Sequence, residues 1–163
     1  MRAAKPGAED DSPAMWLRRG QEKPVPLGEL WRDAILYWCP KGDCLVLVMW
    51  GSIDNAVLRL YDLSGDGVRS VRDLDPEIRR DVRSRIGPKR EITFYFLEIV
   101  GWLSNERMVV AAQAQHVPIP EGRPGEDTYE GFIVKLPGGI VERRLSEQEL
   151  RERYGFSGSI NPF

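Results

Sequence analysis

Two apolar segments separated by a tight turn, within residues 36–50, constrain the fold of this chain more than any other feature. The turn is the sequence Pro-Lys-Gly-Asp at residues 40–43, and every residue of the segment that follows it, 44–50, is apolar. Proline fixes φ, glycine accepts positive φ, and an aspartate side chain bonds its own backbone, so these residues favour a turn. An unbroken apolar strand is typical of one that is buried on both faces. We therefore predict a β-hairpin whose second strand is buried on both sides.

The only two cysteines, Cys39 and Cys44, flank this turn. Facing residues of a hairpin have Cα atoms about 4.5–5.5 Å apart, which a disulfide can span. We predict that the two are bonded, with two reduced, half-buried thiols as the alternative. Residues 1–11 hold five charged side chains and no apolar stretch of a signal peptide. A disulfide therefore predicts a periplasmic or otherwise exported protein whose signal is absent from this sequence, whereas reduced cysteines would predict a cytoplasmic one.

Size and charge exclude several classes of protein. A chain of 163 residues with 42% hydrophobic and 29% charged residues is typical of one globular domain. The net charge of −2 gives no reason to expect a nucleic acid or an anionic membrane as partner. No apolar stretch approaches the roughly 18 residues of a membrane span. A basic run without interleaved aromatic residues is interpreted as a solvated helix face: Arg79, Arg80, Arg83, Arg85, Lys89 and Arg90.

The rest of the chain predicts a tail, further strands and two helices. Residues 1–30 hold four prolines and three glycines among charges, which indicates an extended tail or linker. Alternating or β-branched segments predict strands over 56–63, 68–71, 92–100, 108–115, 132–136 and 140–141.

Helix signals are clear at two places. Asp75, followed by a proline, is the predicted N-cap of a helix that ends at Gly87. Ser146 and Glu149 form a predicted capping box for a second helix, which ends at Gly155.

The two halves of the chain match in strand order, turn chemistry and terminal helix. We predict two repeated units, 31–88 and 92–156, within a single β-rich domain over 31–163. Each unit is expected to be an antiparallel β-meander followed by a short α-helix. The predicted fold class is therefore mainly β, of the α+β type.

Residues 38–47 and 60–68 also resemble a blade of the TolB-like β-propellers. An aromatic strand, a Cys-Pro-Lys-Gly-Asp turn and an apolar strand are followed by a Tyr-Asp-Leu-Ser-Gly-Asp-Gly hairpin, and residues 102–110 repeat part of the pattern. The resemblance implies propeller-blade-like meanders. Two blades do not close a ring that normally needs four or more. The resemblance therefore implies an open sandwich, or a fold that another chain completes.

One hairpin turn has nearly the spacing of a calcium-binding loop. Positions 1, 3, 5 and 12 of such a loop would be Asp62, Ser64, Asp66 and Asp73. Position 12 is usually a bidentate glutamate, and the preceding residues alternate like a strand rather than a helix. We interpret the segment as a plain turn, with calcium as a weaker alternative. A zinc site would have to recruit a carboxylate to the two cysteines and His116, so no metal or other cofactor is predicted.

The second unit is longer than the first at one place. Residues 45–63 correspond to 108–136, which is ten positions longer, and the excess falls in 117–130. We predict a long loop there, and loops of this length are usually functional or disordered. Its prolines lower the cost of ordering on binding, and its acidic side chains suit a basic cleft; a ligand lid is a further alternative. The predicted partner-binding residues are Glu121, Arg123, Glu126, Asp127, Tyr129 and Glu130.

No nucleophile elbow, phosphate-binding glycine loop or metalloprotease helix is present in the sequence. We predict a non-catalytic protein-binding module. In size, disulfide and sheet-rich build it is similar to the small periplasmic immunity proteins that bacteria make against type VI secretion effectors. Such an inhibitor would occlude the active site of a toxin. The alternatives are an envelope hydrolase that uses His116 and the 116–131 loop, and a scaffold subunit whose open sheet edges pair with another chain.

Overall fold

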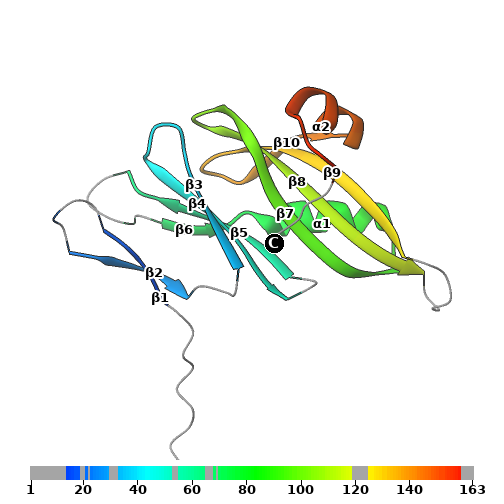
Figure 1. The fold of residues 1–163 in the computed structure, drawn as a ribbon, viewed down its shortest axis with the longest axis horizontal. Helices are drawn as coiled ribbons and strands as arrows, with labels where there is room; N and C mark the ends of the chain where they lie inside the picture. The colour runs from blue at the N-terminus through cyan, green and yellow to red at the C-terminus, as the bar shows by residue number, and fades with distance from the viewer. Residues whose placement is uncertain are drawn as a thin grey trace, which may run out of the picture.

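The computed structural model describes residues 14–18, 21, 23–29, 33–52, 55–64, 68, 70–118 and 125–158, and within them it is mainly β with two helices (Figure 1). The strands are β1 (Ala14–Leu17), β2 (Val25–Glu29), β3 (Asp33–Trp38), β4 (Cys44–Ser52), β5 (Asn55–Asp62), β6 (Ser70–Asp73), β7 (Arg90–Ser104), β8 (Arg107–Pro118), β9 (Glu126–Lys135) and β10 (Ile140–Leu145). The helices are α1 (Asp75–Ile86) and α2 (Glu147–Tyr154). The predicted fold class, mainly β of the α+β type, is confirmed.

Two four-stranded antiparallel meanders follow each other along the chain, and each ends in a helix. The first sheet has the order β3-β4-β5-β6 and precedes α1; the second has the order β7-β8-β9-β10 and precedes α2. One turn hydrogen bond recurs at matching positions. Leu63 N donates to the carbonyl of Asp43 at 2.8 Å, and Leu136 N donates to the carbonyl of Glu106 at 2.7 Å. The topology therefore agrees with the predicted pair of meanders, each followed by its helix.

The hairpin of β3 and β4 forms as predicted, and Cys39 and Cys44 are disulfide-bonded across its turn with Cα atoms 5.3 Å apart. Residues 45–50 of β4 are all buried. Even-numbered residues of this stretch join the core that both sheets share, and odd-numbered residues join a second cluster on the opposite face. β4 therefore has a hydrophobic core on each side.

The second cluster is covered by the β1–β2 hairpin, which the sequence does not predict. Met15 and Leu27 are each 7% exposed and pack there, and the Tyr61 hydroxyl donates to the carbonyl of Leu27 at 2.9 Å. Residues 14–17 and 25–29 thus form a hairpin, where the sequence predicts an extended tail or linker. The segment has the proline and glycine content of a linker, but its side chains alternate between buried and exposed as in a strand. Met15 points inward, and Trp16, which is 59% exposed, points outward. Residues 1–13 lie outside the described part of the chain.

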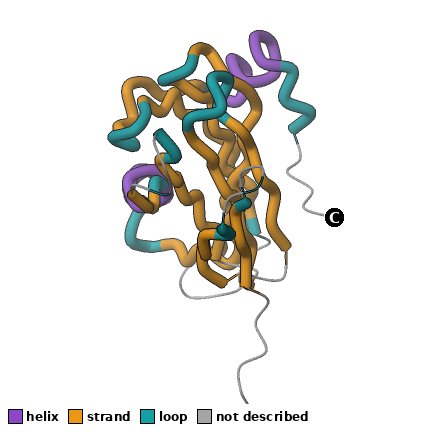
Figure 2. Tube along the Cα trace, turned by 90° about the vertical axis from the view of Figure 1, so that its left-hand side faces the viewer, coloured by secondary structure: helices purple, strands orange, loops and turns teal. Residues whose placement is uncertain are grey.

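The two helices lie on opposite sides of the strands (Figure 2). Consecutive residues of β9 show this. Glu130 pairs with Arg85 of α1, whereas Gly131 lies against Leu150 of α2. Neither helix is long and apolar enough to cross a membrane, among the residues that the structure describes.

The ends of the helices are close to the prediction, with one correction. The capping box of Ser146 and Glu149 is present, and α2 ends at Gly155 with φ 70°. The N-cap of α1 is Leu74 rather than Asp75. The Asp75 carboxylate is buried and accepts a hydrogen bond from Leu58 N at 3.3 Å, because it turns toward β5 instead of capping its own helix.

Loss of the disulfide is expected to lower the free energy of unfolding by about 2 kcal/mol. The two cysteines are five positions apart, and so short a loop gives little closure entropy. Urea denaturation of C39A/C44A, compared with the wild type and with chemically reduced wild type, measures this. The reduced wild type is the control without a mutation and should lose the same amount. A loss more than twice as large would mean that the bond supports more than the hairpin.

Gly131→Ala is expected to destabilise the protein by about 1–3 kcal/mol, the usual cost of overpacking a core. An added Cβ would lie 2.6 Å from Cδ2 of Leu150 and 2.9 Å from Cβ of Leu145. Gly101→Ala, in β7, is the matched control, since its Cβ would meet no atom within 4 Å. Urea denaturation of both variants compares the two positions. Equal effects would show that α2 can move away from β9 without cost.

Candidate functional site

Residues 117–118 and 126–130 of the predicted long loop are strand, while residues 119–124 lie outside the described part of the chain. β8 continues to Pro118 and β9 begins at Glu126, with His116 paired opposite Glu126. Cross-strand pairing outweighs the local preference of charged residues for loops, and the proline stands at the strand end, where a missing N–H is tolerated. Two of the predicted binding residues, Glu121 and Arg123, lie outside the described residues.

The extra residues of the second unit therefore lengthen a hairpin. Counted from the matched Leu45 and Met108, Ser52 at the end of β4 corresponds to Gln115, and β8 runs on to Pro118. β7 lengthens with it, since Arg90 at its start pairs with Pro118. The end of the β8–β9 hairpin lies at the opposite end of the molecule from β1 and β2 (Figure 1).

A polar network braces this extension. Arg90 bonds both carboxylate oxygens of Glu126, with Nη2 3.2 Å from Oε1, and its Nη1 lies 3.0 Å from Nδ1 of His116. Nε2 of His116 lies 2.9 Å from the Thr128 hydroxyl. Arginine only donates, so Nδ1 must accept, and the ring proton is on Nε2, where it is donated to Thr128. His116 is thereby held as one neutral tautomer.

The surroundings of His116 also favour its neutral form. The side chain is 4% exposed, and burial lowers its pKa from the ordinary value of 6.5. The nearby Arg90 charge lowers the pKa further, while Glu126 and Asp127 raise it. With both ring nitrogens already engaged, the imidazole has no free atom with which to take a proton from a substrate.

Glu130 is buried, although the sequence places it in a binding loop. It is 4% exposed, and its Oε1 lies 3.1 Å from Nε of Arg85 at the end of α1. Its Oε2 has no hydrogen-bond partner among the described residues. Burial raises the pKa of Glu130, and Arg85 opposes that rise. The side chain therefore holds α1 against β9 and is not available on the surface.

A pocket of about 350 Å³ lies between the end of α1 and this extension. Its lining side chains are Arg85, Ile86, Arg90, His116, Glu126, Thr128 and Glu130. Two arginines face two glutamates, so the lining has no net excess of either charge. The site therefore supplies both donors and acceptors for a polar group, and no cluster of nucleophile and base.

The remaining predicted binding residues lie near the same end of the hairpin. Glu126 and Asp127 are exposed. Tyr129 is half-buried: its hydroxyl accepts a bond from Gln113 Nε2 at 3.0 Å, and its ring centroid lies 6.0 Å from that of Phe156. Of the predicted binding residues that the structure describes, the exposed acidic ones are therefore the two at the outer end of β9, where they can meet another molecule.

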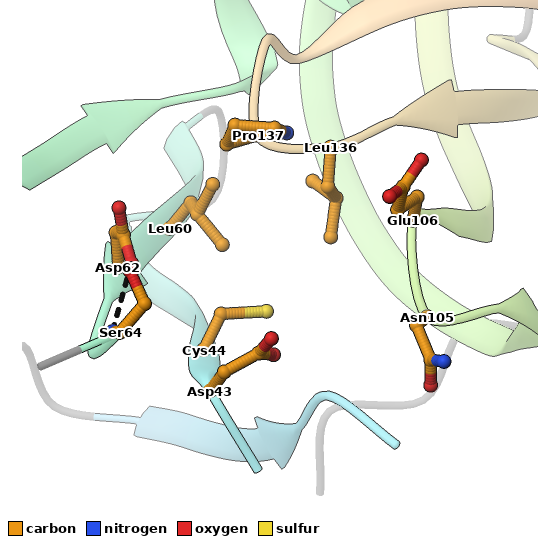
Figure 3. A pocket seen from close by; sticks show the side chains of 9 residues that line it. All are labelled: Asp43, Cys44, Leu60, Asp62, Ser64, Asn105, Glu106, Leu136 and Pro137. Atoms are coloured by element: carbon orange, nitrogen blue, oxygen red, sulfur yellow. Dashed lines mark hydrogen bonds between the residues drawn. The ribbon is translucent and has the colours of Figure 1, made fainter. Parts of the chain in front are cut away.

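The calcium alternative is not supported by the positions of its ligands. Asp62 accepts bonds from the backbone N, at 2.9 Å, and the hydroxyl of Ser64 (Figure 3). Asp73 pairs with Arg59, three cross-strand pairs away from Asp62, or about 10 Å along the strand. Asp66 lies outside the described residues. Within the described ranges no group of three or more His, Cys, Asp or Glu side chains could hold a metal ion.

Figure 3 shows a second pocket, of about 190 Å³, where matching turns of the two units meet. It is lined by Asp43, Cys44, Leu60, Asp62, Ser64, Asn105, Glu106, Leu136 and Pro137. These residues belong to the turn regions that carry the recurring backbone hydrogen bond, so the pocket marks the contact between the units.

Sequence reasoning missed Arg85, Arg90 and Thr128. It assigned both arginines to a solvated face, because their partners lie far along the chain on β8 and β9. The network follows from the strand register, which pairs His116 with Glu126. That register could not be predicted, because the segment is interpreted from its sequence as a loop rather than as two paired strands.

His116 is expected to titrate below its ordinary pKa of 6.5, and Arg90→Gln should raise the midpoint. The rise should be partial, since burial contributes more than Arg90. As pH falls below 6.5 the unfolded chain binds the proton more readily, so acid should destabilise the fold through this residue. His116 is the only histidine, and NMR titration of its ring protons needs no assignment. A midpoint above 6.5, or one that Arg90→Gln leaves unchanged, would contradict the network.

Comparison with known proteins found no matching family model, no matching curated protein and no matching solved structure. No activity can therefore be transferred to this chain from a relative. Its function has to be inferred from its own contacts and charges.

Proposed function

We propose that this protein is a non-catalytic binding module, exported from the cytoplasm, that occludes a secreted toxin or effector enzyme as an immunity or inhibitor protein does. The observation that carries the proposal is the extended β8–β9 hairpin, which one of two otherwise similar meanders has and the other lacks. A scaffold needs no such difference between its halves. An added hairpin at one end of the molecule is a feature that can enter a cleft.

The hairpin is well suited to enter a cleft with little loss of entropy. The bonds among Arg90, His116, Glu126 and Thr128 fix its base before any partner arrives. A preorganised element loses less conformational freedom on binding, and so retains more of its contact energy.

Charge favours a basic site on the partner. Glu91, Glu126 and Asp127 are exposed at this end of the sheet. Arg90 pairs with Glu126, which leaves Asp127 on the opposite face of β9 as an acid directed to solvent. A cleft that binds an anionic substrate would attract these groups, and complementary charge mainly gives specificity and fast association.

The disulfide supports export, since such bonds persist in oxidising compartments. The resemblance to TolB-like blades and the analogy with type VI immunity proteins remain parts of this proposal. The hydrolase alternative is weaker, because both ring nitrogens of His116 are engaged and Glu130 is paired with Arg85.

Shortening the hairpin is expected to abolish binding of the partner without unfolding the domain. In the test variant, residues 117–125 are replaced by Asn-Gly, a two-residue hairpin turn that keeps His116 paired with Glu126. The probe is the exported product of the gene adjacent to the one that encodes this chain, with growth of the host and the Kd as readouts. Wild type should restore growth, and the shortened variant should not.

Asp127→Lys is the finer test and should weaken the Kd by about tenfold or more, the effect of losing one central contact. The matched control is Glu152→Lys, which reverses an exposed charge on α2. Far-UV circular dichroism and melting curves verify that each variant is folded. Full binding by the shortened variant would refute the role of the hairpin, and failure of the wild type to bind would refute the partner assignment.

A further inference from the structure

β3 is an edge strand with an apolar surface. Among the described residues it pairs with β4 alone. Ile35, Leu36 and Trp38 are 43%, 49% and 52% exposed. Natural edges are usually protected by lysine, proline, a bulge or a covering segment. β3 has no lysine or proline, and its register with β4 is unbroken from Asp33 to Trp38.

The backbone of β3 offers its outer hydrogen-bonding groups at known positions. Cys39 N donates inward to the carbonyl of Cys44 at 3.1 Å. Along a regular strand the N–H and C=O groups alternate between the two neighbours. Those of Ala34, Leu36 and Trp38 therefore point away from β4, toward the open edge.

We propose that β3 pairs antiparallel with β3 of a second copy of this chain, with Leu36 opposite its own copy. A two-fold axis perpendicular to a continuous sheet keeps each face on the same side. Two residues that are paired across the axis must therefore have their side chains on the same face of the sheet. Centring the axis on Leu36 places Ile35 opposite Tyr37 and Ala34 opposite Trp38. In this register every outward N–H and C=O of residues 34–38 finds a partner.

The side chains of β3 and its lack of charge favour a second copy of this chain as the source of the pairing strand. Residues 34–38 contain no charged side chain, and the single charge of the strand, Asp33, falls beyond the paired segment. Two identical strands thus bring no like charges together, which would destabilise the pair. The small Ala34 faces the large Trp38, and the β-branched Ile35 faces an aromatic ring, both favourable cross-strand combinations.

The disulfide preorganises this edge strand for pairing with another strand. Cys39 follows directly after Trp38, and its bond to Cys44 fixes β3 on β4. One edge strand covers less than the roughly 1,200–2,000 Å² of stable interfaces. We therefore expect reversible association with a Kd of micromolar order.

Sedimentation velocity of the full chain, from about 1 to about 500 µM, tests the proposal around a Kd of that order. The mass should rise with concentration from 18.6 kDa toward twice that value. Leu36→Lys should weaken the Kd at least tenfold. The matched control is Val71→Lys, at a residue 52% exposed on β6, the other edge of the same sheet, and it should associate as the wild type does.

A cross-linking variant tests the register without depending on stability. Residues of a hydrogen-bonded antiparallel pair have Cα atoms about 5.5 Å apart, within the range of a disulfide. Leu36→Cys should form a covalent dimer on oxidation, and Val71→Cys should not. Peptide mapping verifies that Cys39 and Cys44 remain bonded to each other.

A wild type that stays monomeric over the whole range overturns the proposal, and would leave the edge to a strand of a different protein. Association that Leu36→Lys does not weaken overturns it too, because the interface would then lie elsewhere. Dimers of the wild type without a cross-link in Leu36→Cys would overturn the register. Asp127→Lys should leave self-association unchanged, which separates this surface from the β8–β9 hairpin.

Discussion

The burial of β4 on both faces is the constraint on which the rest of the structure depends. An apolar strand with two buried sides needs a cover on each. The second meander and α1 supply one cover, through the core that Val46 and Val48 share with β7 and β8. The β1–β2 hairpin supplies the other, through Met15 and Leu27. The need for this second cover explains why a proline-containing segment folds as a hairpin.

The two meanders are joined by the helix between them as well as by their sheets. α1 closes the first unit in the chain, yet it packs against β8 and β10 of the second as well as β5. Its charged residues follow this placement: Arg85 pairs with Glu130, and Asp81 pairs with Arg144. Asp75 at its start bonds Leu58 on β5. Removing either unit would therefore expose one side of α1.

Features encoded within a few residues could be predicted from the sequence, and features that depend on distant partners could not. The turn at 40–43, the Cys39–Cys44 bond and the capping box of Ser146 each need only local geometry. The strand character of 126–130 depends on β8 lying alongside it, and the burial of Glu130 depends on α1 passing that strand. In isolation the same residues have the composition of a polar loop. Their tertiary neighbours reversed that preference.

The similarity of the two units makes their differences informative. β3 and β7 are the first strands of their meanders, and both stand at a sheet edge. β7 contacts β4 and β5, with Phe96 beside Trp50 at 6.4 Å between ring centroids. Tyr37 of β3 packs against the shared core, but Ile35, Leu36 and Trp38 remain exposed. Apolar side chains at an open edge are costly in water, and the antiparallel partner strand proposed for β3 would lower that cost by covering part of them.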